Sequence, residues 1–394
     1  MQQLLQKLYV LLFYGICFLL PLERYVRIGP NILLFSLILL FPFVIRKEDT
    51  KKVILPPIVL LIVFSAYTFL NQLIFHPEQP LDVPGRIILS LLFIGLILPI
   101  NNLRYVKQIF IGSVFLCVLI SVGNMLSYYL GSVETYQFVK GDHIANALPI
   151  ERLYLGFLCV ISIILSVDLI GSKFKPLNRY YAINIVIVTA FVLLISSRLG
   201  IVLISILVLL SLFYKTKKVD RLISVLGLVL VLSIAFVSSP ELRNRFNRSV
   251  EKERIVDYIF QDDIRSDAWN ESFHMLKHYD YILKGIGFQG TKENVTKRIN
   301  HQTNKNVINS HNQFVDFMLS AGIPAFLLFI AIFIGTFVAR KKDYVKIALL
   351  LSIVFFLLIE NLYHRQIGAY YVGLVMIFLV YEPLKTKKHQ LDVV

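Results

Sequence analysis

The segment PELRNRF at residues 240–246 opens a long polar stretch that ends in NSHN at residues 309–312. Apolar runs lie on both sides of it, and 57% of the 394 residues are apolar, against roughly 45–50% in ordinary soluble domains. Runs long enough to cross a bilayer recur from end to end, so we expect an all-α polytopic membrane protein. The polar stretch is then its one long loop, and we expect the reacting groups where this loop meets the helices.

Twelve apolar ranges are predicted to span the membrane. They are residues 4–22, 29–45, 53–75, 86–100, 105–130, 150–171, 181–197, 199–214, 220–238, 312–339, 344–361 and 367–381. The predicted organisation is spans 1–9 over residues 1–238, an extracytoplasmic loop with two amphipathic helices over 239–311, and spans 10–12 with a cytoplasmic tail over 312–394. Glu23 and Arg24 follow the first run where a signal peptide would have small residues, so a retained helix is expected.

The basic residues fall mainly on one side of this predicted topology. Outside the long loop, one set of ends and loops carries most of them: Lys7, Arg46, Lys47, Lys51, Lys52, Arg104, Lys107, Lys173, Lys175, Arg179, Lys215, Lys217, Lys218, Arg221, Arg340, Lys341, Lys342, Lys346, Lys385, Lys387 and Lys388. The opposite short loops carry only Arg24, Arg27, Arg86, Lys140, Arg152, Arg198 and Arg365. The positive-inside rule places both termini in the cytoplasm and the long loop outside. The net charge of +15 is therefore a topology signal, and no nucleic-acid partner is expected.

The sequence predicts neither a metal site nor a cofactor site. All three cysteines lie in apolar runs, which is typical of packing residues and not of a disulfide framework. No metal-ligand spacing or serine-hydrolase motif occurs on the predicted outer side. The pattern Gly285-x-Gly287-x-x-Gly290 matches a dinucleotide fingerprint by letter, but no strand precedes it. We therefore expect a glycine turn after a helix over residues 264–283.

Arg198 lies at the tip of a short predicted hairpin, in the sequence SSRLG at residues 196–200. Residues 181–214 must cross the membrane twice, so each arm has about 17 residues, or about 25 Å of helix. The hydrocarbon core is about 30 Å thick, so the tip is expected to be recessed. An arginine there must be paired or hydrated. The flanking serines favour an anion site over a membrane anchor.

Arg265 and His311 are the other two main candidates. Arg265 lies one turn before Trp269 on the expected helix over 264–283, where stacking on the indole could hold a guanidinium for bidentate phosphate binding. The alternative is an ordinary surface pair. His311 opens a long apolar run and is either a general base or a solvated interfacial histidine. Asp316, five residues deeper, either orients a partner or pairs with an arginine.

Accessory candidates lie on other predicted outer turns. Arg86 opens the fourth predicted span, and residues 360–365, with the sequence ENLYHR, form the last outer turn, which ends in Arg365. Each arginine could add positive charge to the same outer pocket or serve as an interface anchor. Trp269, beside Arg265, and Asn312, which follows His311, complete the accessory set.

Three motifs occur in a fixed order between residues 195 and 322. They are Ser-Ser-Arg198-Leu-Gly200 before a span, Arg265-x-x-x-Trp269 with Gly-x-Gly in the long loop, and Ser310-His311-Asn312 followed by Gly322 at the start of the next span. This order in a multi-span chain resembles the O-antigen ligase and O-antigen polymerase superfamily of bacterial surface-glycan enzymes. The chain departs from many relatives in having Leu199 directly after the arginine, where they have glycine.

The resemblance implies a GT-C-like fold and a metal-independent, inverting glycosyltransferase of the inner membrane, with its active site facing the periplasm. It implies a donor glycan linked to undecaprenyl diphosphate, among the membrane lipids. Arg198 and Arg265 resemble the arginines that hold the lipid diphosphate, and His311 resembles the histidine that activates the acceptor hydroxyl.

The acceptor is left open by the sequence. A ligase would use lipid A–core oligosaccharide, which is the first expectation, whereas a polymerase would extend the lipid-linked chain itself. A third kind of relative attaches glycans to protein. A flippase or transporter is the alternative of another class, but it should show inverted repeats and charged or broken helices near the midplane. We find no such repeat.

Overall fold

The computed structural model describes residues 2–131, 146–170, 176–195, 197–214, 233, 264–276, 280–303 and 310–381. These residues form helices and turns, with one isolated bridge between Val53 and Tyr381. The helices are α1 (Gln2–Leu19), η1 (Leu20–Leu22), α2 (Gly29–Val44), η2 (Lys47–Lys52), α3 (Leu55–Phe75), α4 (Asp82–Gly95), α5 (Leu103–Gly131), α7 (Arg152–Leu169), α8 (Pro176–Leu194), α9 (Arg198–Tyr214), α13 (Ile264–Met275), α14 (Asp280–Lys284), α15 (Phe288–Thr303), α16 (Gln313–Arg340), α17 (Tyr344–Ile359), η4 (Leu362–His364) and α18 (Gln366–Val380).

Among the described residues, six helices are long and apolar enough to cross a membrane, namely α1 with η1, α3, α5, α7, α8 and α16. Helices α2, α9, α17 and α18 are apolar but shorter. Each range predicted as a span overlaps a described helix except 220–238, of which the structure describes only residue 233. The first of the two amphipathic helices predicted in the loop, over residues 241–260, and the tail from 382 onward lie outside the described residues. The all-α, multi-span architecture is confirmed, and the number of twelve spans stays a prediction.

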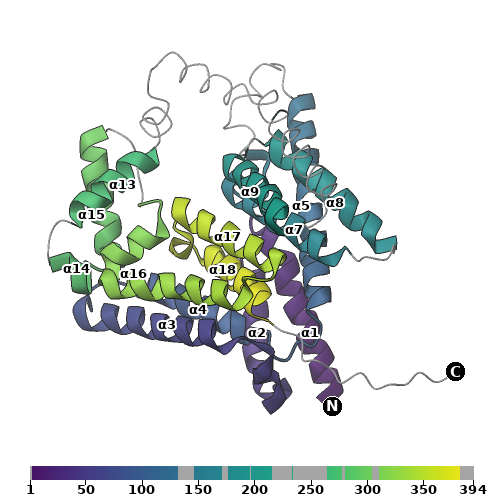
Figure 1. The fold of residues 1–394 in the computed structure, drawn as a ribbon, viewed down its shortest axis with the longest axis horizontal. Coiled ribbons are helices and arrows are strands. Elements are labelled where there is room, and N and C mark those ends of the chain that lie inside the picture. Colours follow the sequence, from purple (N-terminus) through teal and green to yellow (C-terminus); the bar gives the residue numbers. More distant parts are fainter. Residues whose placement is uncertain are drawn as a thin grey trace.

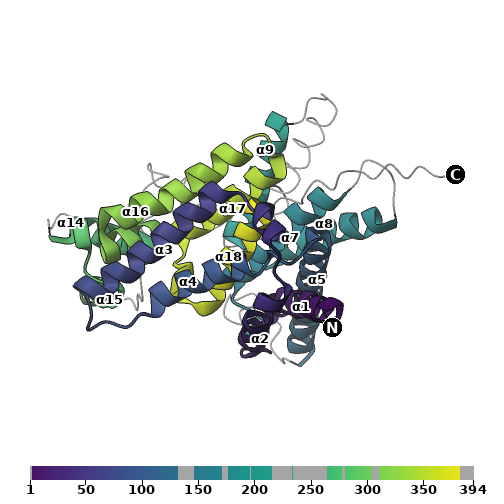
Figure 2. The ribbon, with the colours of Figure 1, turned by 90° about the horizontal axis from the view of Figure 1, so that it is seen from below.

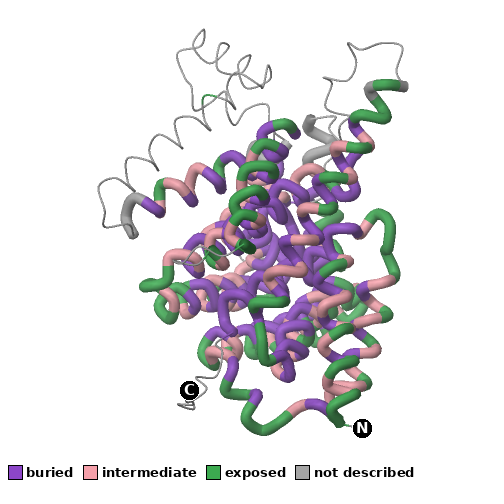
Figure 3. Tube along the Cα trace, turned by 90° about the vertical axis from the view of Figure 1, so that its right-hand side faces the viewer, coloured by how far each residue is buried: buried purple, intermediate pink, exposed green. Residues whose placement is uncertain are grey.

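The helices pack into two connected groups. Helices α3 and α16 lie side by side, with α4 against α3 and α18 (Figures 1 and 2). Helix α7 lies among α5, α8, α9 and α17, and α1 packs against α2 and α5. Buried residues fill the middle of the molecule, whereas exposed residues cover its outside (Figure 3). Many of the exposed side chains on the apolar helices are themselves apolar, including Leu39, Ile62, Val186, Leu327 and Ile334, as expected where lipid takes the place of water.

Helix α16 is bent at Gly322, which has φ 80° and ψ 177° (Figure 1). Its residues before and after the bend form two helical halves, and Pro324 lies in the first turn of the second half. Proline has no N–H, and the glycine departs from helical geometry, so the carbonyls of residues 319–321 lose their partners within the helix. Such carbonyls need other donors when they are buried.

A glycine turn and a tyrosine supply those donors. Gly285 and Gly287 have φ values of 71° and 79°, which confirms the glycine turn expected from the sequence. The contacts are Ile286 N to Leu319 O at 2.9 Å, Gly287 N to Ser320 O at 2.9 Å, and the Tyr67 hydroxyl of α3 to Ala321 O at 3.0 Å. The bend, the turn and α3 therefore form one hydrogen-bonded unit.

The polar segment differs from the prediction in two ways. The single helix expected over 264–283 is divided into α13, which ends at Met275, and α14, which begins at Asp280. The polar stretch from Thr291, for which no helix was predicted, begins inside α15. Gln79 caps α15, because its Oε1 accepts hydrogen bonds from Gln289 N at 3.1 Å and Gly290 N at 3.3 Å.

Candidate functional site

The first turn of α16 begins at a capped N-terminus. Asn312 is buried, and its side-chain oxygen accepts hydrogen bonds from Phe314 N at 3.0 Å and Val315 N at 3.2 Å. This is the geometry of a helix N-cap. The structure therefore places the accessory candidate Asn312 in a fold-determining position directly after His311.

His311 lies just before this cap in a left-handed conformation, with φ 49°. Among the residues that the structure describes, no other non-glycine residue has a positive φ. Its Nδ1 is 3.6 Å from Glu360 Oε2, and the indole Nε1 of Trp269 donates to its backbone carbonyl at 3.5 Å. Unusual backbone conformations of this kind persist where the surroundings hold them, often at functional sites.

A second histidine–carboxylate pair lies beside the first. His364 Nε2 is 2.9 Å from Asp316 Oδ2, and Gln313 Nε2 donates to the same oxygen at 3.2 Å. Asp316 is only 1% exposed, so its carboxylate depends on such donors. Of the two roles that the sequence left open for Asp316, the structure shows the first, in which it orients a partner.

The two pairs connect the same two segments, and each segment supplies the histidine of one pair and the carboxylate of the other. His311 and Asp316 belong to the segment that starts α16. Glu360 and His364 belong to the turn over residues 360–365, which keeps here the name outer turn from its predicted orientation. Asn361 Nδ2 also donates to Ser310 Oγ at 3.0 Å, and Tyr363 N donates to Gln313 Oε1 at 2.9 Å. The outer turn is therefore a wall of the site and not a peripheral connector.

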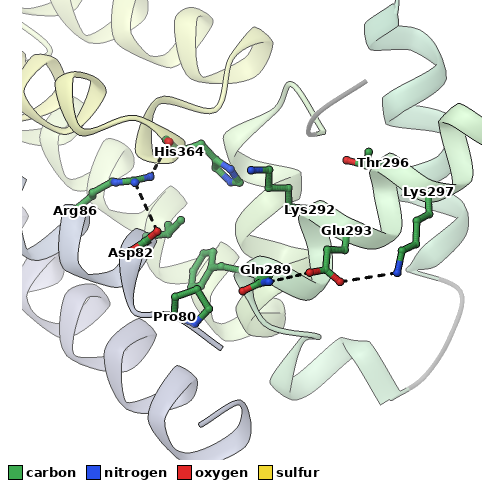
Figure 4. Close-up of a pocket in the computed structure, with 11 residues that line it drawn as sticks. Pro80, Asp82, Arg86, Gln289, Lys292, Glu293, Thr296, Lys297 and His364 are labelled. Atoms are coloured by element: carbon green, nitrogen blue, oxygen red, sulfur yellow. Dashed lines mark hydrogen bonds and ion pairs between the residues drawn. The ribbon is translucent and has the colours of Figure 1, made fainter. Parts of the chain in front are cut away.

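Arg86 fixes this turn from the side of α4. Its Nη1 donates to His364 O at 2.6 Å, and its Nη2 lies 3.8 Å from Asp82 Oδ2 (Figure 4). The same Nη1 also donates to Tyr363 O at 3.3 Å. The arginine expected to open a span is therefore inside α4, one turn after its start. It donates hydrogen bonds to two backbone carbonyls and also lines a polar pocket.

Arg365 faces another neighbour. Its Nη1 is 2.5 Å from Glu151 Oε1, directly before α7, and its guanidinium lies 5.3 Å from the centre of the Tyr154 ring. These contacts join the start of α18 to the start of α7. A role for Arg365 in binding substrate stays a prediction.

The backbone of Arg198 lies at the end of α9 that packs against the start of α7. A Cβ on Gly156 of α7 would lie 2.0 Å from Ser197 Oγ, so the two chains are in close contact there. The next residue, Phe157, stacks on Phe356 near the end of α17 at 4.3 Å. Arg198 thus belongs to the end of the bundle at which the outer turn begins, while its side chain and Ser196 lie outside the described part of the structure.

Arg265 is placed in a similar way. Its backbone is in the first turn of α13, and its side chain is outside the described part. Trp269, one helical turn later, contacts the His311 carbonyl. Since residues four apart share a helix face, α13 brings the Arg265 position toward the start of α16. The meeting of all three candidate side chains stays a prediction.

Two pockets flank the start of α16. A polar pocket of about 420 Å³ lies between α4, α15 and His364 (Figure 4). An apolar groove of about 450 Å³ begins at Phe273 and Asn312 and continues between α16 and α17 along Met318, Phe326 and Ile330. In the described ranges, no three histidine, cysteine or acidic side chains are grouped so as to hold a metal ion.

The family model described as O-antigen ligase matches residues 183–330. The match contains Arg198, Arg265 and His311 but ends before Glu360 and His364. No curated protein matches the chain.

Proposed function

We propose that this protein transfers a glycan from a polyprenyl diphosphate to an acceptor hydroxyl. The proposal rests on the match of residues 183–330 to the family model described as O-antigen ligase. The protein is a multi-pass membrane protein. In the full proposal the donor lipid is undecaprenyl diphosphate, the acceptor is lipid A–core oligosaccharide, and the reaction occurs at the periplasmic face of the inner membrane.

His311 is the proposed general base. The acceptor hydroxyl gives its proton to the imidazole while its oxygen attacks the anomeric carbon of the donor sugar. The bond from that carbon to the diphosphate oxygen breaks, and the electron pair leaves with the lipid diphosphate. Attack opposite the leaving group inverts the anomeric configuration. Glu360, 3.6 Å from Nδ1, stabilises the imidazolium that forms, as carboxylates do in other histidine-based sites.

Arg198 and Arg265 are proposed to bind the diphosphate. Negative charge grows on the leaving group as the bond breaks, and fixed guanidinium groups stabilise it. The observation that carries the proposal is the contact between Trp269 and the His311 carbonyl. It supports a site in which the helix of Arg265 and the proposed base are held together.

The apolar groove supports a lipid-linked donor. It begins beside Asn312, the residue after His311, and its other lining side chains are apolar. A polyprenyl chain could lie in such a groove while its diphosphate remains at the polar end, where a charged group is less costly than in the hydrocarbon region.

One reconstitution experiment tests the proposal. Purified protein in nanodiscs receives lipid-linked glycan with core lipid in one sample and without it in another. Glycan on core lipid identifies a ligase, and a ladder from donor alone identifies a polymerase. Donor consumption without either product, or no release of the lipid diphosphate, would contradict transfer, and movement of intact donor across a bilayer would identify a transporter.

A further inference from the structure

We infer that the polar pocket between α4, α15 and the outer turn binds the sugar of the acceptor, and that His364 contacts an acceptor hydroxyl there. The inference rests on the proposed function, because it assigns one of the two substrates of that reaction. The pocket is formed by three segments far apart in sequence, with Arg86 on α4, Lys292 on α15 and His364 on the outer turn among its lining residues (Figure 4).

The chemistry of the lining suits a carbohydrate. Sugar hydroxyls both donate and accept hydrogen bonds, so they need acceptors as well as donors around them. The pocket offers carboxylates from Asp82 and Glu293, an amide from Gln289, and the hydroxyl of Thr296. The Phe288 ring adds an apolar surface, as ligand pockets combine apolar walls with a few placed polar groups.

Lys292 is the cation that remains for a ligand. The carboxylate of Asp82 is 3.8 Å from Arg86, and that of Glu293 is 3.9 Å from Lys297. Within the described ranges Lys292 has neither an ion pair nor a hydrogen bond. Its ammonium points toward His364 across the pocket (Figure 4). The pocket therefore presents one uncompensated positive charge, which fits a sugar that carries an anionic substituent or a hydroxyl that accepts a hydrogen bond.

The His364 ring is held in one orientation. Asp316 occupies Nε2 at 2.9 Å, which leaves Nδ1 for a ligand. Arg86 holds the backbone carbonyl of the same residue at 2.6 Å. The side chain is only 12% exposed, so the ring is a wall of the pocket and not a mobile surface group. With Nε2–H donated to the carboxylate, Nδ1 accepts a hydrogen bond from a hydroxyl.

The location fits an acceptor site and not a donor site. His364 lies four residues after Glu360, the partner of His311, on the same short turn. The apolar groove for the proposed donor lipid lies on the side of Asn312, between α16 and α17. The donor and the acceptor would thus reach the start of α16 from two sides, and each would face one histidine–carboxylate pair.

The test measures binding and transfer separately on the full-length protein in nanodiscs. Core oligosaccharide freed of its lipid is titrated into the protein, and transfer is then measured with acceptor varied at fixed donor and with donor varied at fixed acceptor. We expect Lys292→Ala and His364→Gln each to weaken acceptor binding and raise the acceptor KM about tenfold. The donor KM should stay within about twofold of the unmodified protein.

Matched controls keep the outcomes distinct. Lys284→Ala removes an exposed lysine outside the pocket and should change neither KM. A raised donor KM in place of the acceptor KM would assign the pocket to the donor sugar and overturn the inference, as would unchanged binding in both pocket variants. Acceptor binding that depends on Lys292 without any transfer would instead support the pocket and contradict the proposed function.

Asp316→Asn tests the positioning of the ring. An asparagine keeps a hydrogen-bond acceptor but removes the charge, so the acceptor KM should rise while the melting temperature changes little. A lower melting temperature with an unchanged acceptor KM would make Asp316 purely structural and would contradict its role in orienting His364. Lys292 is exposed, so its variant should fold even where a change at the buried pair does not.

Discussion

Asp316 holds the ring of His364 at 2.9 Å although the two residues are 48 positions apart. The contact joins the first turn of a helix inside the family match to a turn that lies beyond it. Asp316 Oδ1 accepts no hydrogen bond from any residue that the structure describes. The carboxylate therefore keeps one oxygen without a hydrogen bond in the described structure. Its other oxygen holds the His364 imidazole at the wall of the polar pocket.

Replacement of His311 by alanine should abolish transfer. We expect the rate to fall about 10²- to 10⁴-fold, because a general base contributes about that much. Glu360→Gln should give a smaller loss, since the base remains but its imidazolium loses a neighbouring charge. Transfer is measured with the reconstituted protein, and thermal unfolding establishes that the variant is folded. His274→Ala removes an exposed histidine of α13 and should keep full activity. Full activity in His311→Ala would remove His311 from the mechanism.

Loss of either proposed diphosphate-binding arginine should weaken use of the donor. Arg198→Ala and Arg265→Ala should each raise the donor Kd about 10- to 100-fold, because charged hydrogen bonds contribute about 1.5–3 kcal/mol. Lysine at either position should restore only part of the affinity, since it lacks the bidentate fork. Arg298→Ala is the control, because it also removes an arginine of the polar segment but one that has no proposed role in donor binding. Arg298 lies on α15, and its Nη1 is 4.0 Å from Glu271. Unchanged donor affinity and turnover in both alanine variants would refute the diphosphate assignment.

The bend of α16 should not tolerate a side chain at Gly322. An alanine Cβ there would lie 2.1 Å from the carbonyl oxygen of Leu283. The backbone conformation, with φ 80° and ψ 177°, adds about 1–3 kcal/mol of strain for any residue but glycine. We expect Gly322→Ala to lower the melting temperature in detergent. Gly123→Ala is the matched control, because a Cβ at that helical position meets nothing within 4 Å. It should leave stability unchanged or raise it by up to about 1 kcal/mol. Equal melting temperatures for both variants would show that Gly322 is not a constraint.

Gln79 should stabilise α15 from a distance of more than two hundred residues in sequence. Its side chain caps the helix and its Nε2 donates to Ile286 O at 3.0 Å. Gln79→Ala should cost about 0.5–2 kcal/mol, as for other lost caps. Hydrogen exchange should then speed up in α15 and in the turn at 285–287, while α7 stays protected. Faster exchange in α7 as well, or unchanged exchange in α15 and the turn, would contradict a local role.

Much of the helical architecture could be predicted from hydropathy. Apolar runs gave the positions of α3, α5, α7 and α16 closely, because each must bury its backbone polar groups within one segment. Helix α15 was missed because its sequence contains few apolar residues. Of its described side chains, the buried ones are the apolar Phe288 and Val295 and the polar Thr291. Thr291 accepts a hydrogen bond from Ser320 at 2.9 Å, a contact with α16 that no periodicity reveals.

The candidate site was predictable only in part. His311 stood out by its place before a long apolar helix, and the glycine turn by its spacing. The partnership of His311 with Glu360, and of Asp316 with His364, depends on the packing of α16 against the outer turn. These pairs join residues about fifty positions apart, and the sequence contains no local pattern for them. For Arg86 the sequence left open a pocket charge or an interface anchor, because its main partners are backbone carbonyls, which a sequence pattern does not reveal.

The hydrogen bonds between the glycine turn and α3 limit how this protein can be re-engineered. Tyr67, Asn71 and Gln79 all bind backbone groups of residues 283–290 or of the α16 bend. All three precede the segment that matches the family. A chimera that grafts only the polar segment and α16 from a relative would keep the side chains of Tyr67, Asn71 and Gln79 but replace the segment whose backbone carbonyls accept their hydrogen bonds. An exchange of substrate specificity between relatives should therefore carry residues 67–79 along with the grafted segment.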